Sequence, residues 1–112
     1  MVNKSRKQRG RQTELIFAEY LKQEGWIYAE ATSASAAGTD ITGVIGVDWE
    51  LKAKKDFNPV AAMKQQTQRI KEGVIPIAVL RQNGQGEADI ENWPACVPVS
   101  VMIQLLKEAG YL

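Results

Sequence analysis

The chain has 112 residues, of which 45% are hydrophobic and 24% charged, so it can form one compact domain and is too short for two. It contains no histidine and a single cysteine, Cys96. This composition excludes Ser-His-Asp and Cys-His catalysis, histidine-ligated zinc and an internal disulfide. Any bound metal must therefore be held by oxygen ligands, which favour hard ions such as Mg²⁺ or Mn²⁺.

The net charge of +1 is unevenly distributed along the chain. The first thirteen residues hold five basic side chains and no acid, which leaves nine basic and thirteen acidic residues, a net −4, for the rest. We predict a basic arm over residues 1–12 that contacts a polyanion, and a single domain over residues 13–112. A solubilising terminus is the alternative. The basic residues of the arm are Lys4, Arg6, Lys7, Arg9 and Arg11.

The sequence has no apolar run of about 18 residues, and no apolar segment follows the basic N-terminus. Both features argue against a membrane span and a secretory signal. One cysteine fits a reducing compartment, so we expect a cytoplasmic protein in which Cys96 is a small buried side chain.

Hydrophobic residues at helical spacing predict a first helix that Thr13 caps and that runs to about Glu24, just before Gly25. Its apolar face also contains Glu14, whereas Glu19 points away. The apolar members of that face are Phe17, Ala18, Tyr20 and Leu21.

The next segments predict strands. We expect a short strand over residues 26–30, a loop of small residues over 31–39, and a two-stranded hairpin over 40–53 that turns near residues 45–46. Side chains alternate between the two faces of a strand. In the second strand of the hairpin, one face therefore holds Val47, Trp49 and Leu51, and the other holds Asp48, Glu50 and Lys52.

Asn58 is expected to cap a second helix with Pro59 at its first position, a favoured arrangement, and this helix should end at Gly73. Residues 74–80 form a nearly continuous apolar run, typical of a buried strand whose regular pairing begins after Pro76. The expected inward side of the helix consists of Val60, Met63, Gln66, Thr67 and Ile70.

Residues 82–93 read as a polar loop and residues 95–99 as a last strand. Ser100 should cap a closing helix over residues 101–109, which Gly110 ends. The predicted fold is α/β (α+β), with the order α-β-β-β-α-β-β-α around one central mixed sheet of about five strands flanked by helices.

Three residues of the hairpin form a candidate active site. Asp40 opens one strand, and Glu50 and Lys52 lie on the next, where the strand period places them on the same face. Two carboxylates on neighbouring strands can bind a divalent ion. Hydrolysis of a phosphodiester needs an activated water and neutralisation of the charge on the phosphate, which a metal ion with an adjacent ammonium can supply.

The residues Gly38-Thr39-Asp40 and Glu50-Leu51-Lys52 resemble the signature of the PD-(D/E)XK nuclease superfamily. Gly10-x-x-x-Glu14 in the first helix, the carboxylate-bearing hairpin and a following helix with Gln66 resemble its Holliday-junction-resolvase branch and related small phage-encoded nucleases. The resemblance covers residues 7–79, and the ending 105–111 is similar to the tails of such phage proteins. It implies a restriction-endonuclease-like core.

The resemblance also implies a role for each matching residue. Asp40 and Glu50 correspond to metal ligands, Lys52 to the catalytic lysine, and Glu14 to a glutamate that approaches the metal directly or through water. Gln66 corresponds to a glutamine near the site, although Gln65 and Gln68 leave that register open. Thr39 stands where the family usually has proline.

Each of these residues has an ordinary structural alternative. Glu14 could be a solvated acid at a helix start, but its place on an apolar face favours the metal role. Asp48 shares the face of Glu50 and is either a rival ligand or, as we favour, a residue that ends the hairpin. Gln66 could be an ordinary inward polar residue.

Further side chains are candidates for phosphate contacts. The basic character continues beyond Lys52 into Lys54 and Lys55, and Ser33 and Ser35 lie in the loop before Asp40. A solvated strand end and a plain loop of small residues are the alternatives. Trp26, Trp49 and Trp93 are expected in the core or an interface, with Trp93 left open because it lies in a polar loop.

The resemblance implies a Mg²⁺-dependent DNA endonuclease, with Mn²⁺ able to substitute, that acts on branched DNA as a homodimer, in a bacterial host cell if the protein is phage-encoded. The apolar C-terminal helix with Trp93 and Tyr111 could supply the dimer interface. The alternatives are a nuclease of restriction or repair type on duplex or single-stranded DNA, a non-catalytic DNA-binding protein with a nuclease-like fold, and an interaction protein in which Asp40, Glu50 and Lys52 form surface ion pairs.

Overall fold

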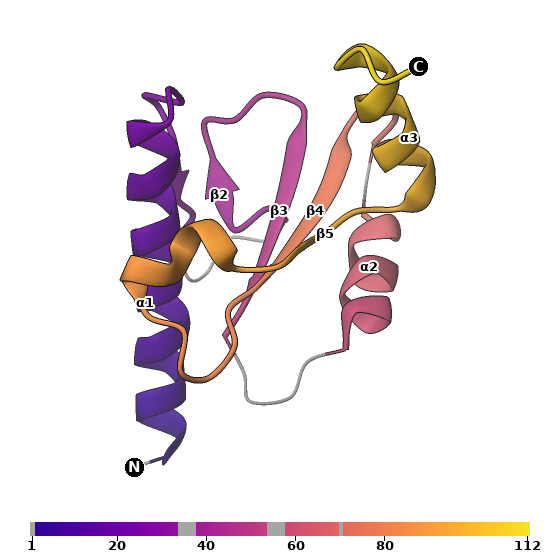
Figure 1. Cartoon of the computed structure of the whole chain (residues 1–112). Coiled ribbons are helices and arrows are strands. Elements are labelled where there is room, and N and C mark those ends of the chain that lie inside the picture. Colours follow the sequence, from indigo (N-terminus) through magenta and orange to yellow (C-terminus); the bar gives the residue numbers. More distant parts are fainter. Residues whose placement is uncertain (1, 34–37, 54–57, 70) are drawn as a thin grey trace.

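The computed structural model describes residues 2–33, 38–53, 58–69 and 71–112, and its side chains are described from residue 8 onward. These residues form an α+β fold with three α-helices, one short 3₁₀ helix and five strands in two sheets (Figure 1). The predicted order of helices and strands is confirmed, with the 3₁₀ helix as an addition. None of the described helices is long and apolar enough to cross a membrane.

Helix α1 spans Val2–Gln23, so the expected start at Thr13 is wrong. Thr13 lies inside the helix, is almost fully buried, and donates its hydroxyl to the carbonyl oxygen of Arg9 at 2.8 Å. The preceding segment is rich in lysine, arginine and glutamine, which are good helix formers, so the helix continues through it. The basic residues of the predicted arm are therefore part of α1.

The expected apolar face of α1 is confirmed. Phe17, Ala18 and Leu21 are buried, Tyr20 packs against them, and Glu19 is exposed. Because this face lies against the strands, α1 covers one side of the fold.

The smaller sheet contains two very short strands. Strand β1, Glu30–Ala31, pairs antiparallel with β2, Ile41–Thr42. The strand expected over residues 26–30 is thus reduced to its last residue, because the amide of Ala29 donates to the carbonyl of Trp26 and forms a turn there. Trp26 itself is 47% exposed.

The larger sheet has the order β3-β4-β5. Strand β3, Val47–Lys52, runs parallel to β4, Ile75–Leu80, and β5, Ala95–Cys96, pairs antiparallel with β4. The ladder between β3 and β4 includes Pro76 and begins before it, and β5 is shorter than expected.

The prediction of one mixed sheet built on a β2–β3 hairpin is wrong, because β2 and β3 belong to different sheets. The turn between them contains Gly43 and Gly46 with φ of 84° and 81°, values that favour glycine, and a side chain at Gly43 would overlap the backbone of Tyr28. Side chains of Thr39 and Asp40 take the place of a regular ladder beside β3.

Helix α2, Pro59–Thr67, begins as expected: the side chain of Asn58 accepts a hydrogen bond from the amide of Ala61. It ends at Thr67 and not at Gly73, which instead adopts a φ of 84° before β4. Ala62 and Gln66, four residues apart, are its buried positions. Of the expected inward side, Met63 is half-buried and Val60 and Thr67 are exposed, while Ile70 lies outside the described residues.

The predicted polar loop contains a 3₁₀ helix, η1, over Glu87–Asn92. Helix α3, Val99–Glu108, begins directly after Pro98, so Ser100 is not its cap. A proline before the first turn fixes an extended backbone there, which starts the helix earlier. Gly110, with a φ of 91°, follows the helix end as expected.

The core has two parts, one on each side of the larger sheet. The main cluster joins α1 to β3 and contains Phe17, Trp49 and Trp93, with the rings of Phe17 and Trp49 edge to face at 5.0 Å. Ala62, Ala78 and Leu80 form the second cluster between α2 and β4, and the half-buried Cys96 packs against it. Strand β3 is thus held between α1 and α2 (Figure 1).

Candidate active site

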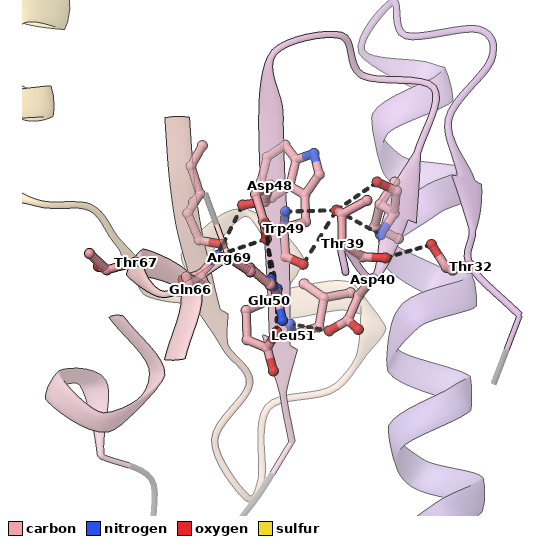
Figure 2. A network of polar contacts seen from close by, with 12 residues as sticks. Thr32, Thr39, Asp40, Asp48, Trp49, Glu50, Leu51, Gln66, Thr67 and Arg69 are labelled. Atoms are coloured by element: carbon pink, nitrogen blue, oxygen red, sulfur yellow. Dashed lines mark hydrogen bonds and ion pairs between the residues drawn. The ribbon is translucent and has the colours of Figure 1, made fainter. Parts of the chain in front are cut away.

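The candidate site lies where the segment before β2 meets the middle of β3. The backbone amide of Asp40 donates to the carbonyl of Trp49 at 2.8 Å, and its Oδ2 accepts from the amide of Leu51 at 2.7 Å (Figure 2). Thr39 reinforces this junction, since its hydroxyl oxygen accepts from the amide of Trp49 at 2.8 Å. The Asp40 carboxylate is therefore fixed directly beside Glu50.

Carboxylates from three segments lie within electrostatic range of one another in this region. Burial, followed by the charge of Glu50, raises the pKa of Asp40, although the Leu51 amide, Arg69 and Lys52 act in the opposite direction. Burial, followed by the charge of Asp40, also raises the pKa of Glu14, with Glu50 contributing in the same sense and Arg11 opposing. The structure thus brings Glu14 of α1 into the electrostatic field of Asp40 and Glu50.

Lys52 lies on the same face of β3 as Glu50, as the strand period predicts. Its Nζ is 3.0 Å from Oε1 of Glu50, and Glu50 is only 6% exposed. In the part of the chain that the structure describes, no three acidic or cysteine side chains already form a group close enough to hold a metal ion.

Arg69 is the residue of this region that sequence reasoning missed. Its Nε donates to Oδ2 of Asp48 at 2.9 Å, and its Nη2 donates to Oδ1 of Asp48 at 2.7 Å and to Oε2 of Glu50 at 2.8 Å (Figure 2). The hydrogen bonds to Asp48 raise the pKa of Arg69 above its already high ordinary value. Asp48 and Glu50 alternate on one strand face, and two buried acids require a cation nearby. This pattern in the sequence could have indicated a basic partner.

Asp48 therefore has a different role from the one expected. It is 8% exposed and paired through both carboxylate oxygens with Arg69, so it does not simply end a hairpin. The reason is that α2 and the turn after it cover this face of β3, where Gln66 and Arg69 contact Asp48.

Gln66 is the inward glutamine of α2, whereas Gln65 and Gln68 are exposed. Its Nε2 donates to the carbonyl oxygens of Asp48 at 3.0 Å and Ile77 at 3.2 Å, and lies 3.3 Å from Oδ1 of Asp48. Gln66 thus supports the Asp48 segment of β3, and these hydrogen bonds do not involve Asp40, Glu50 or Lys52.

The predicted phosphate contacts fall into two groups. Arg9 donates to the carbonyl of Gln82 at 3.2 Å, and Arg11 donates to that of Thr32 at 2.7 Å while lying 3.7 Å from Glu14, so both contact their own chain. Ser33 is exposed after β1. The remaining predicted contacts lie outside the described side chains: Lys4, Arg6, Lys7, Ser35, Lys54 and Lys55.

Comparisons with protein-family models, with curated proteins and with solved structures give no match for this chain.

Proposed function

We propose that this protein is a metal-dependent DNA endonuclease that hydrolyses phosphodiester bonds. The observation that supports the proposal is the position of Lys52, whose Nζ lies 3.0 Å from Oε1 of Glu50, in a region where burial and neighbouring carboxylates raise the pKa of Asp40 and Glu14. Partly buried titratable groups with raised pKa values that share a site are typical of functional sites.

The donor set fits a hard divalent ion. Asp40, Glu50 and Glu14 offer carboxylate oxygens. Burial and the charges of neighbouring carboxylates raise the pKa of Asp40 and Glu14, and a cation among them would favour their charged forms. Mg²⁺ or Mn²⁺ bound there would supply a water of lowered pKa and neutralise charge on a phosphate.

The role of Lys52 follows from its position. Its ammonium lies beside Glu50 on the exposed side of the same strand face, with about a quarter of its side chain accessible. It can donate to a phosphate oxygen or orient a water while Glu50 stays within contact, and both actions stabilise developing negative charge. Loss of the ammonium should therefore affect the reaction more than DNA binding.

The substrate that we propose is branched or otherwise structured DNA, bound by a homodimer. The described helices and strands form a single α+β fold. Many of the basic residues that could contact phosphates lie in α1. Contacts with phosphates alone recognise the shape of DNA and not its base sequence.

The proposal is tested by a cleavage panel. A four-way junction, a flap, a single strand, a linear duplex and a supercoiled plasmid are incubated with the protein and either Mg²⁺ or EDTA. We expect cutting only with Mg²⁺ and fastest on the junction. No cutting of any substrate with Mg²⁺ or Mn²⁺ would contradict the proposal.

Variants locate the activity. Glu50→Ala and Lys52→Ala should each abolish cutting and largely retain DNA binding, measured by gel shift with the junction in EDTA. Lys64→Ala, which removes an exposed lysine of α2, is the matched control and should cut normally. Full activity in Glu50→Ala or Lys52→Ala would refute the assigned site.

A second candidate is an interaction protein in which the acids serve as structural ion pairs. It is favoured by one observation: both oxygens of Glu50 already have cationic partners, Lys52 and Arg69. This candidate predicts no binding of divalent ions. Calorimetry with Mn²⁺ separates the two, since our proposal expects binding to the wild type that Asp40→Ala abolishes.

A further inference from the structure

The carboxylate of Glu50 is held by two cations, each on a different oxygen. Lys52 contacts Oε1 at 3.0 Å and Arg69 contacts Oε2 at 2.8 Å. A charged side chain that is 6% exposed requires such partners, because an unpaired buried charge is very costly. Any divalent ion that uses Glu50 must therefore compete with one of the two.

Arg69 is anchored more firmly than Lys52. Its planar guanidinium makes two hydrogen bonds to Asp48, at 2.7 and 2.9 Å, in addition to the bond to Glu50 (Figure 2). Such a two-point contact fixes the orientation of the group, whereas an ammonium on a flexible stem is a point charge. The contact of Lys52 with Oε1 of Glu50 is a single-point contact of this kind.

Asp48, which holds Arg69, is itself held by Gln66 of α2. Asp48 is buried, and the fully buried Gln66 donates to its backbone carbonyl at 3.0 Å and lies 3.3 Å from its carboxylate. Asp48 and Glu50 are two residues apart on β3, so one guanidinium reaches both carboxylates on the same face. The Asp48–Arg69 pair therefore forms a fixed support next to Glu50.

We propose that Arg69, held by Asp48, is a positioning residue for Glu50: it keeps Oε2 and leaves Oε1 to a divalent ion. This inference rests on the proposed nuclease function. With a divalent ion bound at Oε1, the ammonium of Lys52 would lose its contact with Glu50 and would be available to a phosphate oxygen. Lys52, which has one contact to Glu50, would move, whereas Arg69, which has three hydrogen bonds to Asp48 and Glu50, would stay in place.

Two conservative variants test this assignment by separating cleavage rate from metal affinity. Arg69→Lys retains the positive charge but loses the fork that bridges two carboxylates. We expect cleavage at saturating Mn²⁺ to fall by about ten- to a hundredfold, as for other residues that orient a ligand, while Mn²⁺ affinity from calorimetry stays within about threefold of wild type.

Asp48→Asn changes the other side of the pair. The amide can still accept from Gln66, but the charge of Arg69 is then balanced by Glu50 alone, so Mn²⁺ affinity should fall by about tenfold. Glu19→Gln, which neutralises an exposed acid of α1, is the control for loss of a negative charge and should leave both quantities unchanged. Thermal unfolding of each variant without metal verifies that it is folded.

A normal rate of Arg69→Lys at saturating Mn²⁺ would overturn the positioning role. So would an unchanged Mn²⁺ affinity in Asp48→Asn, because the ion pair would then serve stability alone. A wild-type protein that neither binds Mn²⁺ nor cuts DNA gives a different result, since it contradicts the nuclease function before any variant is compared.

Discussion

Gln66 joins two strands through one buried amide group. It is 0% exposed, and its Nε2 donates to backbone carbonyls of both β3 and β4. Gln66→Ala would leave those carbonyls without this donor and open a cavity, so we expect the free energy of unfolding to fall by about 2–4 kcal/mol. Urea titration measures the change.

Gln65→Ala is the matched control for Gln66, because Gln65 is one residue away on the same helix and exposed. Its effect should stay within about 0.5 kcal/mol. Equal losses in the two variants would show that the amide of Gln66 has no special contribution.

Asp40 is the residue whose charge state should affect stability with pH. Its pKa is raised by burial and by Glu50 above the ordinary value of 3.8, so in the window above 3.8 the folded state binds more protons than the unfolded state. In the metal-free protein, Asp40 therefore lowers the free energy of unfolding as the pH rises. This loss is absent below pH 3.8 and complete above the raised pKa. Glu14, also raised, acts in the same sense above 4.5.

Asp40→Asn removes that penalty while an amide oxygen can still accept from Leu51. We expect the variant to be more stable than wild type at pH 7 in EDTA, with the difference shrinking as the pH falls. Urea unfolding at several pH values measures both chains, and the exposed Glu19→Gln serves as control. A stability advantage that grows on acidification would contradict the sign.

The residues that sequence reasoning placed correctly depend on local periodicity. Glu50 and Lys52 share a face because a strand alternates, and Glu14 lies on the apolar side because a helix repeats every 3.6 residues. Arg69 reaches Asp48 across 21 positions of sequence, from the turn that follows α2. Arg69 lies in this turn because α2 ends at Thr67. The predicted helix to Gly73 would have placed Arg69 within the helix, so its contact with Asp48 was not expected.

At the scale of elements, helix existence and order were predictable and strand pairing was not. The two-residue strands β1 and β2 contain too few positions to show alternation. The hairpin was expected because two strand-like runs flank a glycine turn. Instead, side chains of Thr39 and Asp40 bond to the β3 backbone, a choice that depends on tertiary packing.

Helix α1 carries the predicted DNA-binding charges as part of a regular element. Replacing Lys4, Arg6 and Lys7 together by glutamine keeps helix-forming residues and removes three positive charges. We expect weaker junction binding and a salt dependence shallower by about three units of slope, measured by gel shift at several salt concentrations.

The melting temperature of this triple variant should be unchanged, because charge and not packing is altered. An unaltered salt slope would contradict DNA contacts by these three residues and would favour a solubilising role for the N-terminal charges. Glutamine at the exposed Lys22, near the other end of α1, is the control.

At the scale of the whole molecule, α3 presents an apolar face that no described residue buries. Val99, Met102, Ile103 and Leu106 recur at helical spacing and are each at least 40% exposed. Apolar patches of this kind mark interaction surfaces. Trp93, which we expected to share a dimer interface with this helix, is 6% exposed and belongs to the core, so it is not available.

We expect the protein to sediment as a dimer at tens of micromolar, and Ile103→Lys combined with Leu106→Lys to sediment as a monomer with an unchanged melting temperature. Charged residues in an apolar contact oppose association, whereas on a solvent-exposed helix they are tolerated. Gln104→Lys, on the same helix, is the control. A monomeric wild type would exclude α3 as a dimer interface.

Helix α1 contains both the basic N-terminal residues and Glu14 of the candidate site, so it sets the distance between them. Lys4 and Glu14 are ten residues apart within one helix, a separation of about 15 Å along its axis. Double-stranded DNA rises about 3.4 Å per base pair, so this length corresponds to about four base pairs. A nuclease of this design would need a minimum substrate arm: a strand that ends closer than this to the cut would meet the acidic residues and miss the basic end.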